Sequence, residues 1–173
     1  MSRLRRPILY DRYIFVTVNL LKSRRKLRES DCARLAVAIA RMRRKHGFLL
    51  TAWVFLPDHW HAIIYPIYPA RISLVIAAVK VSSMAAINKG RRERGELWQG
   101  QFFDHALRTV KDYWDTVEYI HLNPVRRGLV KSPEEWKWSS YHEYAGVDAA
   151  VQEKRCGLTI DRVGLPADEK ARI

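Results

Sequence analysis

The chain has few cysteines and no long apolar run, and each shortage excludes a class of protein. Only Cys32 and Cys156 occur among 173 residues. They are too few and too far apart for a secreted disulfide framework, so we expect a reducing compartment. The basic start, MSRLRRP, precedes no apolar signal segment, and no apolar run approaches the roughly 18 residues of a membrane span. We therefore expect a cytoplasmic protein with no membrane partner.

Acidic residues are also scarce beside the basic ones. Thirty-one lysines and arginines stand against eighteen aspartates and glutamates, which gives a formal net charge of +13 and a pI near 10.1. Such a charge attracts polyanions, and nucleic acid is the expected partner. Any one basic cluster could be an ordinary solvated loop or helix end, but the whole set favours DNA or RNA. The clusters lie at 3–6, 22–28, 41–45, 89–94 and 126–127.

The chain contains no internal repeat and no low-complexity segment, and its pattern predicts one domain with a short tail. We expect the domain to span residues 1–146 and a polar, flexible C-terminal tail to span 147–173. Aromatic and β-branched runs predict strands at 13–20, 49–56, 59–65 and 98–108. Apolar periodicity predicts helices at 31–46, 71–88 and 111–122.

This order of elements predicts an α+β fold. A succession of strand, helix, strand, strand, helix and strand is the ferredoxin-like pattern, an antiparallel sheet with helices packed on one face. The other face would then be free for a site. We expect Ser30 or Asp31 to cap the first helix and Gly90 to end the second.

Two histidines separated by one tryptophan mark the stretch LPDHWHAIIYP, residues 56–66. Side chains alternate along a strand, so His59 and His61 share a face and both rings can reach one point above the sheet. That geometry suits a single metal ion, although a pair of strand histidines is more often structural. On ligand softness alone, two imidazoles favour zinc or another transition metal. A third ligand has to come from another element.

The stretch KDYWDTVEYIHLNPVRRGLV, residues 111–130, predicts a helix with two different faces. Tyr119 and Asn123, four residues apart, lie on a polar face about a quarter turn from the apolar stripe. From there they could meet the histidines, or Tyr119 could be an ordinary half-buried tyrosine. Pro124 disfavours helical geometry in the residue before it, which predicts a kink at Asn123. The apolar stripe consists of Tyr113, Val117 and Ile120.

These stretches resemble a known family. LPDHWHAII is similar to the His-hydrophobic-His motif of single-tyrosine HUH nucleases, and YIHLNPVRRGLV is similar to the tyrosine-bearing segment of the REP-associated tyrosine transposases. GELWQGQFFDHALR at 95–108 and WKWSSYHEYAG at 136–146 agree with the same group, so the resemblance covers about residues 10–146. The family usually has Pro-Asn before the first histidine, whereas this chain has Pro57 and Asp58.

The resemblance implies roles for four residues. His59 and His61 would be metal ligands, Tyr119 the nucleophile, and Asn123 a third ligand or a group that orients the tyrosine. It implies Mg²⁺ or Mn²⁺ in place of zinc. The implied activity is cleavage and joining of single-stranded DNA, folded into REP-type hairpins, through a covalent 5′-phosphotyrosine. The alternative is a non-catalytic DNA-binding protein of the same fold; the presence of both histidines and the tyrosine favours catalysis.

Other polar and aromatic residues have two interpretations each. Asp104, His105 and Arg108 could contact phosphate or simply end a strand, and Trp98 is more easily a core residue than a base-stacking one. The sequence leaves open whether the protein is a monomer or a homodimer. The basic residues that we expect to contact DNA are Lys80, Arg91, Arg92, Arg108, Arg126 and Arg127.

Overall fold

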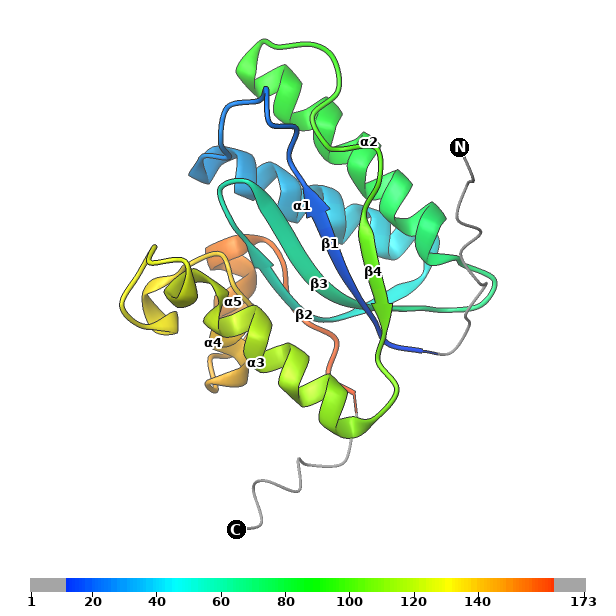
Figure 1. Cartoon of the computed structure of the whole chain (residues 1–173), viewed down its shortest axis with the longest axis vertical. Coiled ribbons are helices and arrows are strands. Elements are labelled where there is room, and N and C mark those ends of the chain that lie inside the picture. Colours follow the sequence, from blue (N-terminus) through cyan, green and yellow to red (C-terminus); the bar gives the residue numbers. More distant parts are fainter. Residues whose placement is uncertain (1–11, 164–173) are drawn as a thin grey trace.

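A four-stranded antiparallel sheet forms the centre of the computed structural model, which describes residues 12–163 (Figure 1). The strand order is β2-β3-β1-β4, and every neighbouring pair is antiparallel. The α+β ferredoxin-like arrangement predicted from the order of elements is confirmed. The strands are β1 (Ile14–Asn19), β2 (Phe48–Phe55), β3 (His59–Pro66) and β4 (Phe103–Ala106). The helices are α1 (Glu29–His46), α2 (Ile72–Arg91), α3 (Val110–Arg126), η1 (Pro133–Glu135), α4 (Tyr141–Tyr144) and α5 (Ala149–Cys156).

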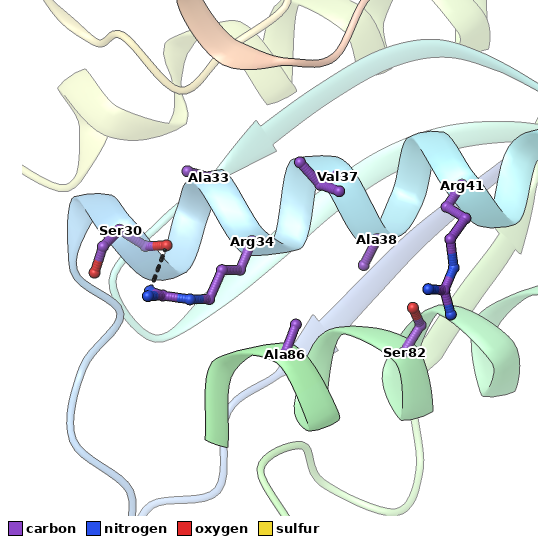
Figure 2. A pocket seen from close by; sticks show the side chains of 8 residues that line it. All are labelled: Ser30, Ala33, Arg34, Val37, Ala38, Arg41, Ser82 and Ala86. Carbon is purple, nitrogen blue, oxygen red and sulfur yellow. Dashed lines mark hydrogen bonds between the residues drawn. The ribbon is translucent and has the colours of Figure 1, made fainter. Parts of the chain in front are cut away.

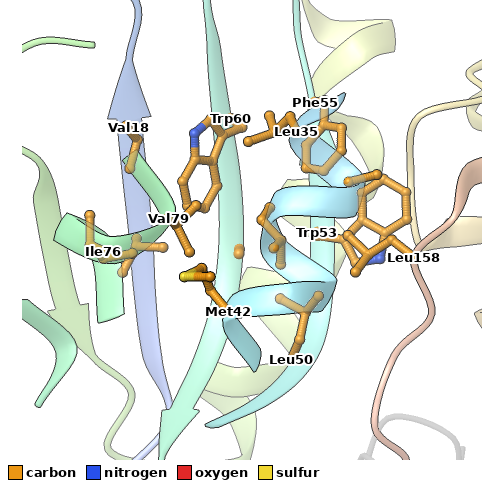
Figure 3. Packing of buried hydrophobic residues seen from close by; sticks show 14 of the residues in the cluster. Val18, Leu35, Met42, Leu50, Trp53, Phe55, Trp60, Ile76, Val79 and Leu158 are labelled. Atoms are coloured by element: carbon orange, nitrogen blue, oxygen red, sulfur yellow. The ribbon is translucent and has the colours of Figure 1, made fainter. Parts of the chain in front are cut away.

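The main core lies between the sheet and the helix pair α1 and α2. Side chains of one parity along β1 and β3, including Val18 and Trp60, enter this core (Figure 3). Leu35 from α1 and Ile76 from α2 pack against them, and none of these four is more than 1% exposed. Burial of so much apolar surface is the main source of stability for this layer.

The third long helix covers the opposite face of the sheet, which corrects the prediction that all helices pack on one face. Val117 and Ile120 of α3 pack on Val54 of β2 and Ile63 of β3 in a second, smaller core. The apolar stripe predicted for this helix is therefore confirmed, but it needs its own surface because α1 and α2 already fill the first face. The face expected to be free is partly roofed by α3 (Figure 1).

Two helix ends differ from the prediction because tertiary contacts decide them. Helix α1 is capped by Arg28, and Asp31 lies inside the helix, where its carboxylate accepts a hydrogen bond from the Arg28 N–H at 2.9 Å. Helix α2 continues through Gly90 to Arg91 and ends at Arg92 in the left-handed region, with φ of 56°. The guanidinium of Arg34 lies where a side chain at Gly90 would go, so this glycine serves close packing inside the helix.

The fourth strand is shorter than predicted and the third helix is longer. Only Phe103–Ala106 pair fully with β1, while Trp98 forms an isolated bridge to Leu20. Trp98 is 3% exposed and its indole N–H donates to Ser83 Oγ at 3.0 Å, which confirms it as a core residue. Helix α3 passes through Pro124, where the predicted kink gives way to a final helical turn. A proline so close to the helix end removes only one ladder hydrogen bond.

Residues 148–163, part of the predicted flexible tail, pack on the body of the protein. Asp148 caps α5, and Gln152 and Cys156, four residues apart, are buried on one side of that helix. The carboxylate of Asp161 accepts the Leu50 N–H of β2 at 2.8 Å. These contacts, together with the hydrogen bond from Gln152 Nε2 to the Ser139 carbonyl at 3.1 Å, hold the segment on the body of the protein. Residues 164–173 lie outside the described part.

Helix α2 is long and apolar enough to cross a membrane by length and composition alone. Core helices of this length and composition are equally apolar. Val75 and Val79 of this helix are buried in the main core, and the helix lies along α1.

The two cysteines, Cys32 and Cys156, are both free and buried.

Candidate active site

The two histidines of β3 face α3, on the side of the sheet away from the main core. Antiparallel pairing places His59 opposite Asn19 of β1 and His61 opposite Thr17. Directly paired residues share a face, so these four side chains form one polar group. The histidines are 6% and 3% exposed. The alternation predicted from the sequence is therefore confirmed, with Trp60 directed into the opposite core.

The two imidazole rings point one nitrogen each at the other. His59 Nε2 and His61 Nε2 are 3.0 Å apart, while the outer nitrogens bind the protein. His59 Nδ1 is 2.6 Å from Asp58 Oδ1, and His61 Nδ1 is 2.8 Å from Thr17 Oγ1. An ionised carboxylate only accepts, so His59 donates from Nδ1 and its Nε2 carries a lone pair. The Thr17 hydroxyl can donate or accept, which allows either tautomer of His61.

Burial keeps both histidines neutral near pH 7. It lowers the pKa of His59, against the opposing effect of Asp58, and it lowers the pKa of His61 to about 3, with the nearby His59 adding to the shift. Burial would raise the pKa of Asp58, but the His59 hydrogen bond and the charge of Arg127 outweigh it and lower that pKa. The pair thus presents neutral imidazoles beside an ionised carboxylate, the state in which histidine binds metals.

Helix α3 brings the predicted tyrosine to the histidines. The ring of Tyr119 packs edge-on against His61, with 5.5 Å between centroids, and against Phe15 at 5.9 Å. The guanidinium carbon of Arg126 lies 5.7 Å from the centre of the tyrosine ring. Tyr119 is 38% exposed. A phenol that is wedged against one histidine and still open to solvent has access to a large substrate.

Asn123 completes the group and leaves one atom unpaired. Its side chain is 5% exposed, with Nδ2 at 3.3 Å from His61 Nε2. The Oδ1 atom is buried without a hydrogen-bond partner in the described structure. A buried polar atom without a partner is costly, and an exchange of the amide oxygen and nitrogen would place the oxygen beside the imidazoles.

The donor atoms of these residues fit a divalent cation. Two imidazole nitrogens face each other beside the Asn123 amide, and exchange of the amide atoms would give the orphaned oxygen a partner in a cation bound between them. Within residues 12–163 no group of three or more His, Cys, Asp or Glu side chains could hold a metal. The site has only two such side chains, and its third donor is an amide. These donor atoms suit a cation that accepts both nitrogen and oxygen.

The predicted DNA-contacting residues fall into two groups in the structure. Arg126 and Arg127 lie at the end of α3 beside the site, where Arg127 donates to Asp58 Oδ2 at 2.9 Å. Arg92 is exposed at the end of α2, and Arg108 is exposed just before α3, beyond the opposite end of β1 from His59. The basic cluster at 3–6 lies outside the described residues.

The other two predicted contacts are engaged within the protein. The Lys80 ammonium donates to the carbonyls of Gln99 at 2.6 Å and Gly100 at 2.9 Å, which holds the loop before β4. The Arg91 side chain, 7% exposed, forms an ion pair with Asp31 at 2.8 Å. The charged groups of Lys80 and Arg91 therefore stabilise contacts within the protein.

A separate groove between α1 and α2 lies on the other side of the sheet (Figure 2). It measures about 430 Å³ and is lined mainly by small and aliphatic side chains, with Arg34 and Arg41 at its sides. Arg34 donates to the Ser30 carbonyl at 2.9 Å. The groove contains neither histidine nor tyrosine, so it offers no chemistry like that of the α3 face.

Sequence reasoning missed the roles of Thr17 and Asp58 in orienting the histidines. Asp58 was noticeable as a departure from the family's Pro-Asn, but its bond to the next residue depends on the turn between β2 and β3. Thr17 becomes a partner of His61 only through the register of β1 and β3. A threonine is common in a strand rich in β-branched residues, so its presence in the sequence does not indicate a functional role.

Comparisons with known proteins identify the family of the chain. The family model described as "Transposase IS200 like" matches residues 10–123. The REP-associated tyrosine transposase of Escherichia coli (strain K12) is 34% identical over 143 residues, which are 82% of this chain and 84% of that protein. A second relative, from Haemophilus influenzae, is 30% identical over 107 residues, 56% of this chain and 61% of that protein.

A solved structure supports the same assignment. It is described as the REP-associated tyrosine transposase bound to a REP hairpin, and it superimposes with a TM-score of 0.73 at 34% identity. The match covers 83% of this chain and 84% of that one. The fold, the arrangement of the histidines and tyrosine, and the sequence likeness over most of the chain therefore lead to one conclusion: the chain belongs to the IS200-like transposase family, among the REP-associated tyrosine transposases.

Proposed function

We propose that this protein is a metal-dependent endonuclease and strand transferase that acts on single-stranded DNA folded into REP-type hairpins. The observation that carries the proposal is the convergence of His59, His61, Tyr119 and Asn123 from β3 and α3 at one point of the sheet. The related structure described as bound to a REP hairpin supports the choice of substrate. The net charge of +13 supports binding of a polyanion.

His59 Nε2, His61 Nε2 and the Asn123 amide oxygen would hold Mg²⁺ or Mn²⁺. When bound, the cation would polarise the scissile phosphate and stabilise charge that develops on its oxygens. The protein prepares the ligands: burial keeps the imidazoles neutral, and Asp58 fixes His59 with its lone pair inward. Manganese accepts imidazole and oxygen ligands alike, which makes it a good match to this mixed set.

Tyr119 would then act as the nucleophile. Its phenol oxygen forms a bond to phosphorus as the bond to the 3′ oxygen breaks; the phenol proton is lost and the departing 3′ oxygen takes up a proton. The 5′ phosphate stays on Tyr119, and a 3′ hydroxyl can later reverse the step and join DNA without nucleotide hydrolysis. The edge-on packing against His61 and Phe15 limits the positions of the ring, which favours an oriented attack.

The exposed arginines would hold the DNA backbone. Arg126 and Arg127 flank the tyrosine and the histidines, and Arg92 and Arg108 extend the positive surface away from them. Lys80 and Arg91 would contribute by holding loops in place, because their charged groups already have protein partners. Binding through such contacts falls steeply with salt, since each neutralised phosphate releases counterions.

A covalent trap tests the proposal. Incubation with Mn²⁺ and a hairpin labelled at its 3′ end should give a protein band that keeps the label through denaturing electrophoresis, while a 5′ label should leave with the released strand. Tyr119→Phe should bind the hairpin and form no adduct. Tyr68→Phe, which alters an exposed tyrosine in the β3–α2 turn, serves as the matched control and should form the adduct normally.

Two results would contradict the proposal. An adduct that persists in Tyr119→Phe would move the nucleophile to another residue. Hairpin binding by the wild-type protein without any adduct, with either cation, would identify a DNA-binding protein that lacks cleavage.

A further inference from the structure

A hollow of about 470 Å³ opens beside His59, on the side away from Tyr119. Its lining includes Asn19 at the end of β1, Gln99 before β4, and Lys22 and Lys26 in the loop between β1 and α1. This size suits a small organic group such as a nucleobase. The hollow is polar and carries more cations than anions, which suits a nucleotide better than an apolar ligand.

The walls of the hollow are fixed by backbone hydrogen bonds. The Leu20 N–H donates to the Asp58 carbonyl at 2.8 Å, and the Leu27 N–H donates to the Pro57 carbonyl at 2.7 Å. The Gln99 N–H donates to the Asn19 carbonyl at 2.9 Å. The loop that carries the lysines is therefore tied at both ends to the turn that precedes the histidines, so the hollow exists before any ligand binds.

Asn19 offers an amide that the described part of the protein does not use. Its side chain lines the hollow, lies directly opposite His59 on the same face of the sheet, and makes no hydrogen bond to any residue within 12–163. Gln99, by contrast, donates its Nε2 to the Leu20 carbonyl at 3.1 Å and is held in place. Asparagine and glutamine amides are the usual partners of an adenine edge.

The position of Tyr119 indicates which nucleotide of the DNA the hollow would receive. Tyr119 contacts His61 and Phe15, whereas the hollow is lined by His59 and by Thr17 and Asn19, which follow Phe15 along β1. In an in-line displacement the attacking and leaving oxygens lie on opposite sides of phosphorus. With the phosphate at the histidines and the phenol on the His61 side, the leaving 3′ oxygen and its nucleoside lie on the His59 side.

We propose that this hollow binds the nucleotide on the 5′ side of the cleaved bond and that Asn19 reads its base. Lys22, Lys26 and Arg127 then contact the phosphates of the same strand; both lysines line the hollow and are exposed. The proposal rests on the proposed function for the position of the scissile phosphate. Base reading by the hollow stands on the free amide and the cations alone.

Selection by binding tests the proposal without cleavage. A hairpin library with a randomised single-stranded flank is bound to Tyr119→Phe and, in parallel, to the double variant that also carries Asn19→Ala. One position of the flank should show a preference for adenine of about tenfold, in the range for one bidentate amide–base pair, and Asn19→Ala should reduce it to twofold or less. Asn19→Asp exchanges a donor for an acceptor and should move the preference towards cytosine.

The control and the cleavage map separate the possible failures. Gln101→Ala removes an exposed amide outside the hollow and should leave the preference unchanged. Mapping of the wild-type cut should place the preferred base directly 5′ of the cleaved bond. A preference that Asn19→Ala does not alter, or a position 3′ of the cut, would overturn the inference. An Asn19-dependent preference without any wild-type cleavage would support base reading and overturn the proposed nuclease.

Discussion

The two faces of the sheet use the same strands for different purposes. On the α1 and α2 side, β1 and β3 present apolar residues such as Val18 and Trp60 to the main core. On the α3 side, the intervening residues include Thr17, His59 and His61, all polar and linked by hydrogen bonds. A period of two along one strand thus separates the residues that stabilise the fold from those that do chemistry.

The difference shows how a small domain can keep buried ionisable groups. The main core is apolar, so it supplies most of the free energy of folding. The α3 face buries two histidines at a cost in desolvation, which is visible in their lowered pKa values. The separation predicts that mutations on one face affect stability first and mutations on the other affect cleavage first.

The largest expected effect is on the site face. His61→Ala, or chelation of the cation, should reduce cleavage about a thousandfold or more, equivalent to about 4 kcal/mol of transition-state stabilisation. Affinity for the hairpin should remain, because it comes from the basic surface. Cleavage assays paired with mobility shifts measure both quantities. Normal cleavage by His61→Ala would show that the histidine pair is structural and that the two faces do not differ in function.

The next effect is on the core face, one residue away on the same strand. Trp60→Ala removes a fully buried side chain and should lower the free energy of unfolding by about 3–5 kcal/mol, measured by urea denaturation. Any folded fraction should still form the adduct, since Trp60 faces away from the site. A variant that kept full stability but lost cleavage would remove the distinction between the faces.

Much of this contrast could be predicted from the sequence. Alternation in HWHAII places the histidines together, and helical spacing places Tyr119 and Asn123 on one face; the structure brings the two groups into contact. The face on which α3 packs could not be predicted, because an apolar stripe does not specify its partner. Tertiary packing also decided that α2 continues past Gly90 to Arg91 and that residues 148–163 pack on the body of the protein.

The supporting residues of the site were harder to find for a related reason. The role of Thr17 depends on strand register, and the engagement of Lys80 and Arg91 depends on loops that are remote in sequence. A basic residue in a sequence shows its charge but not its partner. Charge clusters therefore predicted the class of ligand better than the individual contacts.

A smaller effect should come from the carboxylate that supports the pair. Asp58→Asn keeps the volume and can still accept from His59 Nδ1, but it removes the negative charge that favours that tautomer and pairs with Arg127. We expect the affinity for Mn²⁺, measured by titration calorimetry, to fall by about 10- to 100-fold, the range for such supporting residues. Unchanged affinity would show that the site face does not depend on Asp58 for its metal chemistry.

The smallest expected effect concerns a buried carboxyl away from both the site and the main core. Glu143 of α4 is 1% exposed and accepts the Ile160 N–H at 3.0 Å. Burial raises its pKa from 4.5 to about 7, although this hydrogen bond and the charges of Arg162 and Arg43 oppose the shift; Asp161 adds to it.

The raised pKa fixes the sign of a pH dependence. Between about pH 4.5 and 7 the folded protein holds a proton on Glu143 that the unfolded chain has lost. The contribution of Glu143 is therefore fully present below pH 4.5 and is lost as pH rises through 7. One group changes stability by at most about 1.4 kcal/mol per pH unit, so the change over one pH unit is no larger than the tenfold lower limit expected for Asp58→Asn.

Comparison of a variant with the wild type isolates this contribution from the histidines. His61 and His121 are buried, and burial lowers the pKa of each to about 3. Their effect has the opposite sign, because they reduce the free energy of unfolding as pH falls below 6.5. Glu143→Gln should therefore gain stability relative to wild type as pH rises from 5 to 7, in urea titrations at matched salt. Glu153→Gln, at an exposed position on α5, should follow the wild-type curve. If Glu143→Gln also ran parallel to wild type, the carboxyl would titrate alike in the folded and unfolded protein, and its burial beside Ile160 would not raise its pKa.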